Sequence, residues 1–243
     1  MSVKNTTILI LLNNFVDKDI QAMFFPLNLL QRLFLCPKYT FKNNFIYPNS
    51  LFSNFVSICG TLGIVSLFLN RLLKDFVILI SFGVNVFFVS AFYDCFFNSF
   101  GFIANCLTCI IHSKRNIKFV LTFQKIHRII NDKKQFKLFI IGNWLCVFSN
   151  IIFYSIMDVW ALKYFLDFQF YALVTVAIMI CFDSDIVYAI RMIQLLKDKV
   201  ILWNKTVLVT EIESNKMLEA FCDIFECYNI YKSSFKHFVS IWV

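Results

Sequence analysis

Long apolar runs are the feature that most constrains how this chain folds. Residues 50–70 are 21 consecutive positions without a charged side chain. A helix rising about 1.5 Å per residue crosses the roughly 30 Å hydrocarbon core of a bilayer in that length. Three further runs follow at 76–111, 138–157 and 164–190, and Asp94 is the one charge in the first of these. The sequence therefore predicts about four transmembrane helices between residues 50 and 190.

The composition points to the same class of protein. Hydrophobic residues make up 59% of the chain, charged residues make up 16%, and 32 residues are Phe. Such a chain has too little polar surface to coat a water-soluble globule. We therefore expect an all-α integral membrane protein.

The placement of basic residues predicts how the chain is oriented in the membrane. The segment 112–137 contains eight Lys or Arg and one Asp, whereas the joint between the third and fourth runs is poor in positive charge. Short loops rich in Lys and Arg face the cytoplasm. If 76–111 is one helix of roughly 55 Å, the amino terminus, 112–137 and the stretch after Arg191 all lie inside. Two spans there would place the amino terminus and 112–137 on opposite sides, so we predict one helix.

The segments that flank the four runs have different patterns. Residues 1–49 are predicted to be cytoplasmic or interfacial, because 21–45 is apolar but contains two Pro, Arg32 and Lys38. We expect this stretch to lie along the membrane surface and to pack against the bundle. Residues 191–243 begin as a charged cytoplasmic segment. From Met217 to Trp242 apolar residues recur three and four positions apart, which predicts an amphipathic helix and the start of a fifth span.

The cysteines predict neither a disulfide framework nor a metal centre. There are nine, an odd number, and most lie in predicted spans or at cytoplasmic positions. Cys106, Cys109 and His112 have the spacing of metal ligands, but they share one predicted helix that does not reverse to close a tetrahedral site. Apolar packing is the favoured explanation, and no cofactor is expected.

Two acidic features have competing explanations. Asp94 lies within a long apolar helix, where an ionisable group often faces a partner or a water-filled cavity, but it could also lie near the inner interface or be neutral. The residues 183–185, Asp-Ser-Asp, resemble acidic pairs that hold metal-bound diphosphates. A polar inner end of the fourth span explains them better. Because HExxH, GxSxG and a phosphate loop are all missing from the sequence, we predict that the protein is not an enzyme.

Three stretches resemble one receptor family. "NNFIYPNSLFSNF" leads into the first span, "FQKIHRIIND" lies in the basic helix, and "MLEAFCDIFECYNIYKSSF" precedes the fifth span. In order and spacing, over nearly the whole chain, they resemble insect gustatory receptors, particularly those of moths and butterflies. The family signature of Thr-Tyr, five hydrophobic residues and Gln-Phe does not occur. The resemblance implies the amino-terminal part of a seven-span chemoreceptor of inverted topology, in a carboxy-terminally truncated form.

The resemblance also implies a function and partners. Family members are tetrameric, ligand-gated cation channels of the plasma membrane whose amino terminus is cytoplasmic and whose seventh span lines the pore. We expect a receptor subunit for small tastants, of the bitter class, that forms homo- or hetero-tetramers when full length, contacts membrane lipid and binds no nucleic acid. Without the pore helix this chain is expected to be inactive alone. An unrelated multi-span transporter and a non-functional truncated product are the alternatives. A transporter would show an internal repeat, and spans one and two do not resemble three and four.

The resemblance further implies a ligand pocket among spans two, three, four and six, in the outer half of the bilayer. Aromatic walls with a few polar groups suit a small amphipathic ligand. Plain helix packing explains the same residues and is the favoured explanation. The candidate ligand-binding residues are Ser81, Asn85 and Phe88 on span two, Tyr154 and Asp158 on span three, and Phe168, Tyr171 and Thr175 on span four.

Overall fold

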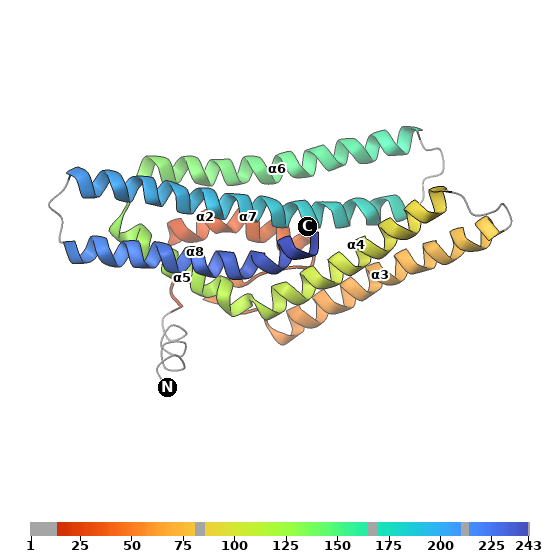
Figure 1. Cartoon of the computed structure of the whole chain (residues 1–243), viewed down its shortest axis with the longest axis horizontal. Coiled ribbons are helices and arrows are strands. Elements are labelled where there is room, and N and C mark those ends of the chain that lie inside the picture. The colour runs from red at the N-terminus through yellow and green to blue at the C-terminus, as the bar shows by residue number, and fades with distance from the viewer. Residues whose placement is uncertain (1–13, 81–85, 165–169, 210–213, 243) are drawn as a thin grey trace.

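A computed structural model describes residues 14–80, 86–164, 170–209 and 214–242, and within these helices it leaves out some side chains, including those of 86–91 and 160–178. The described chain is all-α apart from one small antiparallel hairpin, which confirms the all-α part of the prediction (Figure 1). Its elements are α2 (Lys18–Leu33), β1 (Thr40–Lys42), β2 (Phe45–Tyr47), α3 (Leu51–Ile80), α4 (Val86–Ile111), α5 (Ser113–Ile129), α6 (Lys133–Tyr164), α7 (Phe170–Val209) and α8 (Ser214–Trp242).

The predicted single helix at 76–111 is wrong. Residues 76–80 are the end of α3, and α4 begins separately at Val86 and packs beside α3 (Figure 1). The charges of Arg71, Lys74 and Asp75 suggested a break, but this stretch lacks Gly and Pro and its Leu, Arg and Lys are good helix formers. The chain still runs out and back once before residue 111, so Leu51 and Ile111 lie at the same end of the hairpin.

The predicted third and fourth runs correspond to α6 and α7, but α7 is much longer than expected. It has 40 residues, about 60 Å, and continues to Val209 instead of ending near residue 190. The stretch 191–209 contains no Gly or Pro, and Met192, Leu195 and Leu196 recur at helical spacing and are buried. The helix thus continues through the segment 191–209, whose predicted cytoplasmic location stays a prediction.

The amino-terminal helix α2 is part of the core. It packs against α6 and α7, and the buried ring of Phe24 lies 6.4 Å from that of Phe119 and 6.1 Å from that of Phe123 in edge-to-face contacts with α5. The predicted packing against the bundle is confirmed. The other side of α2 leaves Phe25 and Leu33 exposed, so its position along the membrane surface stays a prediction. Its apolar positions have helical spacing, and those that are buried are Ile20, Met23, Phe24, Leu27 and Leu30.

The predicted helix after Met217 exists as α8, which packs on α5 and α7. Its buried face differs from the apolar face expected from the sequence. The side chains that enter the core are Met217, Ala220, Ile224 and Cys227. The larger apolar side chains Leu218, Phe221, Phe225 and Tyr228 are exposed.

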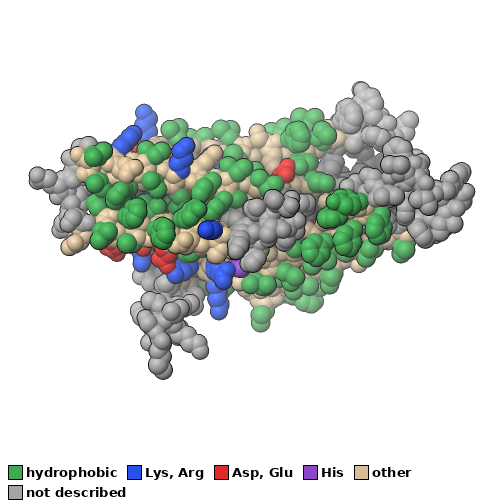
Figure 2. All heavy atoms as spheres, in the orientation of Figure 1, with side chains coloured by type: hydrophobic (Ala, Val, Ile, Leu, Met, Phe, Trp, Pro, Cys, Tyr) green, Lys and Arg blue, Asp and Glu red, His purple; other side chains and the backbone are tan. Residues whose placement is uncertain are grey.

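The elements form two regions. The first, which we call the closed bundle, consists of α2, α5, α8 and the parts of α6 and α7 that surround them, and it contains the main hydrophobic core. The second is the α3–α4 hairpin, which has only a small core of its own with the chain after α2 and with α7. Figure 2 shows apolar side chains covering the surface of the hairpin.

Exposed apolar side chains form continuous stripes along three helices. On α4 they recur at Phe92, Phe96, Phe100, Leu107 and Ile111, and on α6 at Leu138, Ile141, Leu145, Phe148, Ile152 and Ile156. A third stripe on α3 includes Leu51, Phe55, Leu62, Leu69 and Leu73. In the described part of the chain, two helical stretches are long and apolar enough to cross a membrane, Leu51–Asn70 and Lys133–Met157. A third candidate, Phe96–Ile111 with Ser113–Ile129, is bent by 58°.

Candidate functional site

The predicted ligand-binding residues fall mostly outside what the structure describes. Ser81, Asn85 and Phe168 lie outside the described residues. Phe88 is on α4, Asp158 is on α6, and Tyr171 and Thr175 are on α7, but the positions of these four side chains also lie outside the description. The predicted pocket therefore stays a prediction.

Tyr154 is the one predicted residue whose side chain can be followed. Its hydroxyl donates a hydrogen bond of 2.6 Å to Oδ2 of Asp183, so it joins α6 to α7. This contact holds two neighbouring helices together, which is what the packing explanation expects of such a residue.

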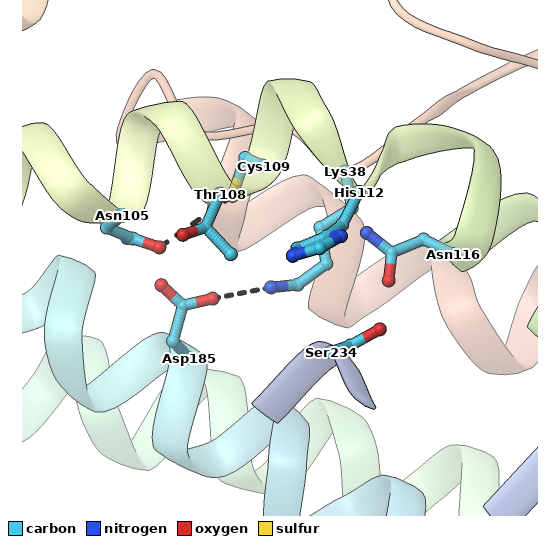
Figure 3. A pocket seen from close by; sticks show the side chains of 8 residues that line it. All are labelled: Lys38, Asn105, Thr108, Cys109, His112, Asn116, Asp185 and Ser234. Carbon is cyan, nitrogen blue, oxygen red and sulfur yellow. Dashed lines mark hydrogen bonds and ion pairs between the residues drawn. The ribbon is translucent and has the colours of Figure 1, made fainter. Parts of the chain in front are cut away.

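A polar chamber lies where the hairpin meets the closed bundle (Figure 3). It encloses about 20 Å³, which is room for one water molecule. Its walls come from the chain after α2, the end of α4, the start of α5, the middle of α7 and the end of α8. The lining residues are Lys38, Asn105, Thr108, Cys109, His112, Asn116, Asp185 and Ser234.

A buried ion pair forms the floor of the chamber. Nζ of Lys38 lies 2.7 Å from Oδ1 of Asp185, and both side chains are almost fully buried. Nε2 of Gln31 donates to the same oxygen at 3.1 Å, and the Lys38 ammonium lies 4.7 Å from the centre of the Tyr188 ring. Burial opposes the charge on Lys38, but the Asp185 carboxylate outweighs it and raises the Lys38 pKa above its usual range. The lysine is therefore a fixed cation in this chamber.

A tight turn after α2 brings Lys38 to this position. Leu35 has φ 61, a left-handed conformation that is rare for a bulky residue, and the amide of Cys36 donates to the carbonyl of Gln31 at 2.9 Å. The side chain of Leu35 lies directly over Gly60 of α3, where a Cβ atom would collide with it. The turn therefore lies close to α3, and a side chain at position 60 would have to push the end of the Leu35 side chain aside.

Oδ2 of Asp185 on α7 and Oγ of Ser234 on α8 line the chamber and have no hydrogen-bond partner within the described residues. A buried carboxylate oxygen and a hydroxyl are costly to leave unsatisfied, and a chamber of this size accommodates a molecule that bonds to both. The arrangement suits a water molecule or another very small hydrogen-bonding group.

Thiols cluster beside the chamber. Nδ2 of Asn105 donates to Sγ of Cys181 at 3.4 Å, and Sγ of Cys109 donates to Oδ1 of Asn105 at 3.7 Å. Hydrogen bonding to the Cys109 and Cys181 thiols, together with burial, raises the Cys36 pKa well above its ordinary value. A high pKa makes this thiol a poor nucleophile. Among the described residues, no group of three or more His, Cys, Asp or Glu has a geometry that could hold a metal ion.

A second buried polar group lies inside the closed bundle. Nζ of Lys199 on α7 donates to the carbonyl of Ile130 at 2.7 Å and lies 3.2 Å from Nδ1 of His127. Burial lowers the pKa of Lys199 to about 8, and burial together with the Lys199 charge lowers the pKa of His127 to about 4. The lysine satisfies the carbonyl at the end of α5, so this group ties α5 to α7.

Sequence reasoning missed the chamber. It noted Asp185 as the polar inner end of a span, and Cys109 and His112 as a ligand-like spacing on one helix. The decisive partner, Lys38, comes from a segment 147 positions earlier in the chain, and no local pattern joins the two. The two Pro residues and the basic residues Arg32, Lys38 and Lys42 in 21–45 were the only signal that this segment has a polar role.

Comparison of the chain with protein-family models, with curated proteins and with solved structures found no match.

Proposed function

We propose that this chain is an integral membrane protein in which α3, α4, α6 and the first part of α7 cross the bilayer. The observation that carries the proposal is the set of exposed apolar stripes on α3, α4 and α6. Exposed patches of this extent are rare on soluble monomers and are typical of surfaces that face lipid or a partner. Lipid explains them best because they run along whole helices of membrane-spanning length.

Within the membrane, we propose an orientation with the amino terminus and the basic segment 112–137 on the cytoplasmic side. Eight basic residues in 112–137 support it, since short segments beside spans carry excess Lys and Arg on that side. The out-and-back path of α3 and α4 is compatible with this orientation, because Leu51 and Ser113 lie at the same end of the hairpin.

For this membrane protein we propose the role of a chemoreceptor subunit of the gustatory type, in the plasma membrane, that responds to small tastants. The support is the order and spacing of the three stretches that resemble insect gustatory receptors. The ligand would bind among the outer parts of α4, α6 and α7, near Phe88, Tyr154 and Tyr171. Assembly with other receptor subunits as a tetramer, and a preference for bitter compounds, belong to the same proposal.

Glycosylation scanning tests the membrane orientation. A glycosylation acceptor inserted near Asn131, in the α5–α6 connection, is expected to stay unmodified, and one inserted at 81–85 is expected to be modified. Modification near Asn131 would contradict the proposed orientation.

Dose–response measurements test the receptor role. In a version joined to a pore helix and expressed in oocytes, Asn85→Leu and Tyr171→Ala are expected to shift the response to a tastant panel while surface expression is kept. Unchanged curves for both variants would remove the ligand assignment, and the absence of any tastant response in the parent would remove the receptor role.

A further inference from the structure

The junction of α4 and α5 joins a lipid-facing stripe to exposed positive charge. The apolar stripe of α4 ends at Ile111, which is 70% exposed. The chain bends by 58° into α5, and the side chains of Lys114 and Arg115 in its first turn are both exposed. Figure 2 shows Lys and Arg side chains beside the apolar surface, along the lower edge of the molecule. Positive charge therefore begins within one turn of the last lipid-facing residue.

Neither cation has an acidic partner among the side chains that the structure describes. The first turn of α5 contains no acidic residue. The next basic residue along α5, Lys118, pairs with Glu226, and Arg128 pairs with Asp17. Within the described part of the chain, no carboxylate lies at ion-pair distance from Lys114 or Arg115. A neutralising anion is therefore expected to come from outside the closed bundle.

The start of α3 adds exposed apolar residues beside the end of α4. α3 begins at the end of the hairpin where α4 finishes, and its first residues, Leu51 and Phe52, are 89% and 75% exposed. These side chains and Ile111 form an apolar rim from two neighbouring helices. If the hairpin crosses the bilayer, this rim lies at the edge of the hydrocarbon, and the next turn of α5 lies at the level of the phosphate groups.

We propose that the α4–α5 junction binds the headgroups of anionic phospholipids. Arg115 offers a planar fork of donors that matches phosphate, and Lys114 adds a compact second charge. The acyl chains of the same lipid pack on Leu107 and Ile111. Anionic lipids of the cytoplasmic leaflet attract basic segments next to membrane-spanning helices. This inference rests on the proposed membrane location, and it adds a lipid class and two contact residues to it.

Native mass spectrometry of the full chain in a neutral detergent tests the proposal. The probes are phosphatidylglycerol and phosphatidylcholine with identical acyl chains. The wild-type chain is expected to bind phosphatidylglycerol about 30-fold more tightly than phosphatidylcholine, from two charges acting at the headgroup. The variant Lys114→Gln/Arg115→Gln is expected to bind both lipids equally.

The matched control is Lys197→Gln/Lys205→Gln, which removes the same charge from two exposed positions on α7. These positions lie about 18 Å and about 30 Å along α7 from Asp185, which is at the level of the junction. The control is expected to keep the full preference. If the control lost its preference for phosphatidylglycerol to the same extent, the preference would be a general effect of charge, and the proposed headgroup site would be wrong.

Three other outcomes would also overturn it. These are equal affinity of the wild type for both lipids, an unchanged preference in Lys114→Gln/Arg115→Gln, and loss of the preference when inorganic phosphate is added. Extraction of cell membranes with alkaline carbonate tells whether the headgroup site alone is wrong or the membrane location is wrong as well. A chain that resists extraction but lacks the lipid preference removes only the headgroup site, whereas an extracted chain removes the membrane location itself.

Discussion

The helices of the α3–α4 hairpin are more apolar than α2, α5 and α8 of the closed bundle, yet they bury fewer of their described apolar side chains. In the closed bundle, side chains such as Phe24, Phe123 and Ile126 are completely buried. In the hairpin, Phe96 and Phe100 are more than half exposed, although their helix is at least as apolar. The closed bundle is stabilised by protein–protein packing, and the hairpin is suited to packing against lipid. The difference shows that hydrophobicity alone does not tell which apolar residues form a protein core.

Removing a large side chain from each region gives the largest contrast. We expect Phe24→Ala to lower the free energy of unfolding by about 4 kcal/mol, because its ring is fully buried among α2 and α5. Phe96→Ala on the hairpin removes the same atoms from an exposed position and is expected to change the stability in detergent by less than about 1 kcal/mol. Chemical unfolding followed by tryptophan fluorescence measures both. Equal losses would show that the hairpin is as tightly packed as the closed bundle.

Breaking the ion pair that joins the regions is expected to have the next largest effect. Lys38→Met leaves the Asp185 carboxylate buried without its cation and is expected to destabilise the protein by about 3 kcal/mol. The double variant Lys38→Met/Asp185→Leu removes both charges and is expected to recover most of that loss. Thermal unfolding of both variants in detergent gives the comparison. A double variant less stable than the single one would contradict a role based on charge pairing.

A charge placed on exposed apolar surface separates lipid-facing from water-facing positions. Phe100→Arg lies in the stripe of α4 and is expected to disfavour membrane insertion by about 2.5 kcal/mol. Phe225→Arg lies on the equally exposed face of α8 in the closed bundle and is expected to leave insertion unchanged. The fraction of chain that resists carbonate extraction reports the difference. If Phe225→Arg impaired insertion as much, α8 would also face lipid.

The last expected effect is a pH dependence confined to the closed bundle. The pKa of His127 is lowered to about 4, mainly by burial, from an ordinary value of 6.5. Between these values the unfolded chain binds a proton that the folded chain does not, so stability falls as the pH falls from 6.5 to 4. We expect the unfolding temperature to drop less over this window in His127→Gln than in the wild type. Carboxylates contribute equally to both proteins, so identical pH profiles would remove His127 as the cause.

The helices could be predicted from the sequence more accurately than their ends. The runs at 50–70 and 138–157, and the helix after Met217, all appear as helices. The sequence analysis missed that the helices continue through 71–75 and 191–209. Both errors have one cause, because charged residues were taken as signs that an apolar run ends. A helix tolerates Lys, Arg and Asp as long as its backbone hydrogen bonds continue, and neither stretch contains Gly or Pro. Charged residues alone therefore do not predict where a helix ends.

The sequence by itself determined the helical class, the apolar surface and the position of the basic segment, because each depends on residues that are close together in the chain. Only the tertiary structure decided which apolar faces are buried, since this depends on the shape of the partner helix. On α8 the small Ala220 and Cys227 face the core and the large Phe221 and Phe225 do not, because the small side chains allow α5 and α7 to approach closely. The pairing of Lys38 with Asp185 likewise joins distant segments, and it exists because the left-handed turn at Leu35 brings the lysine to α7.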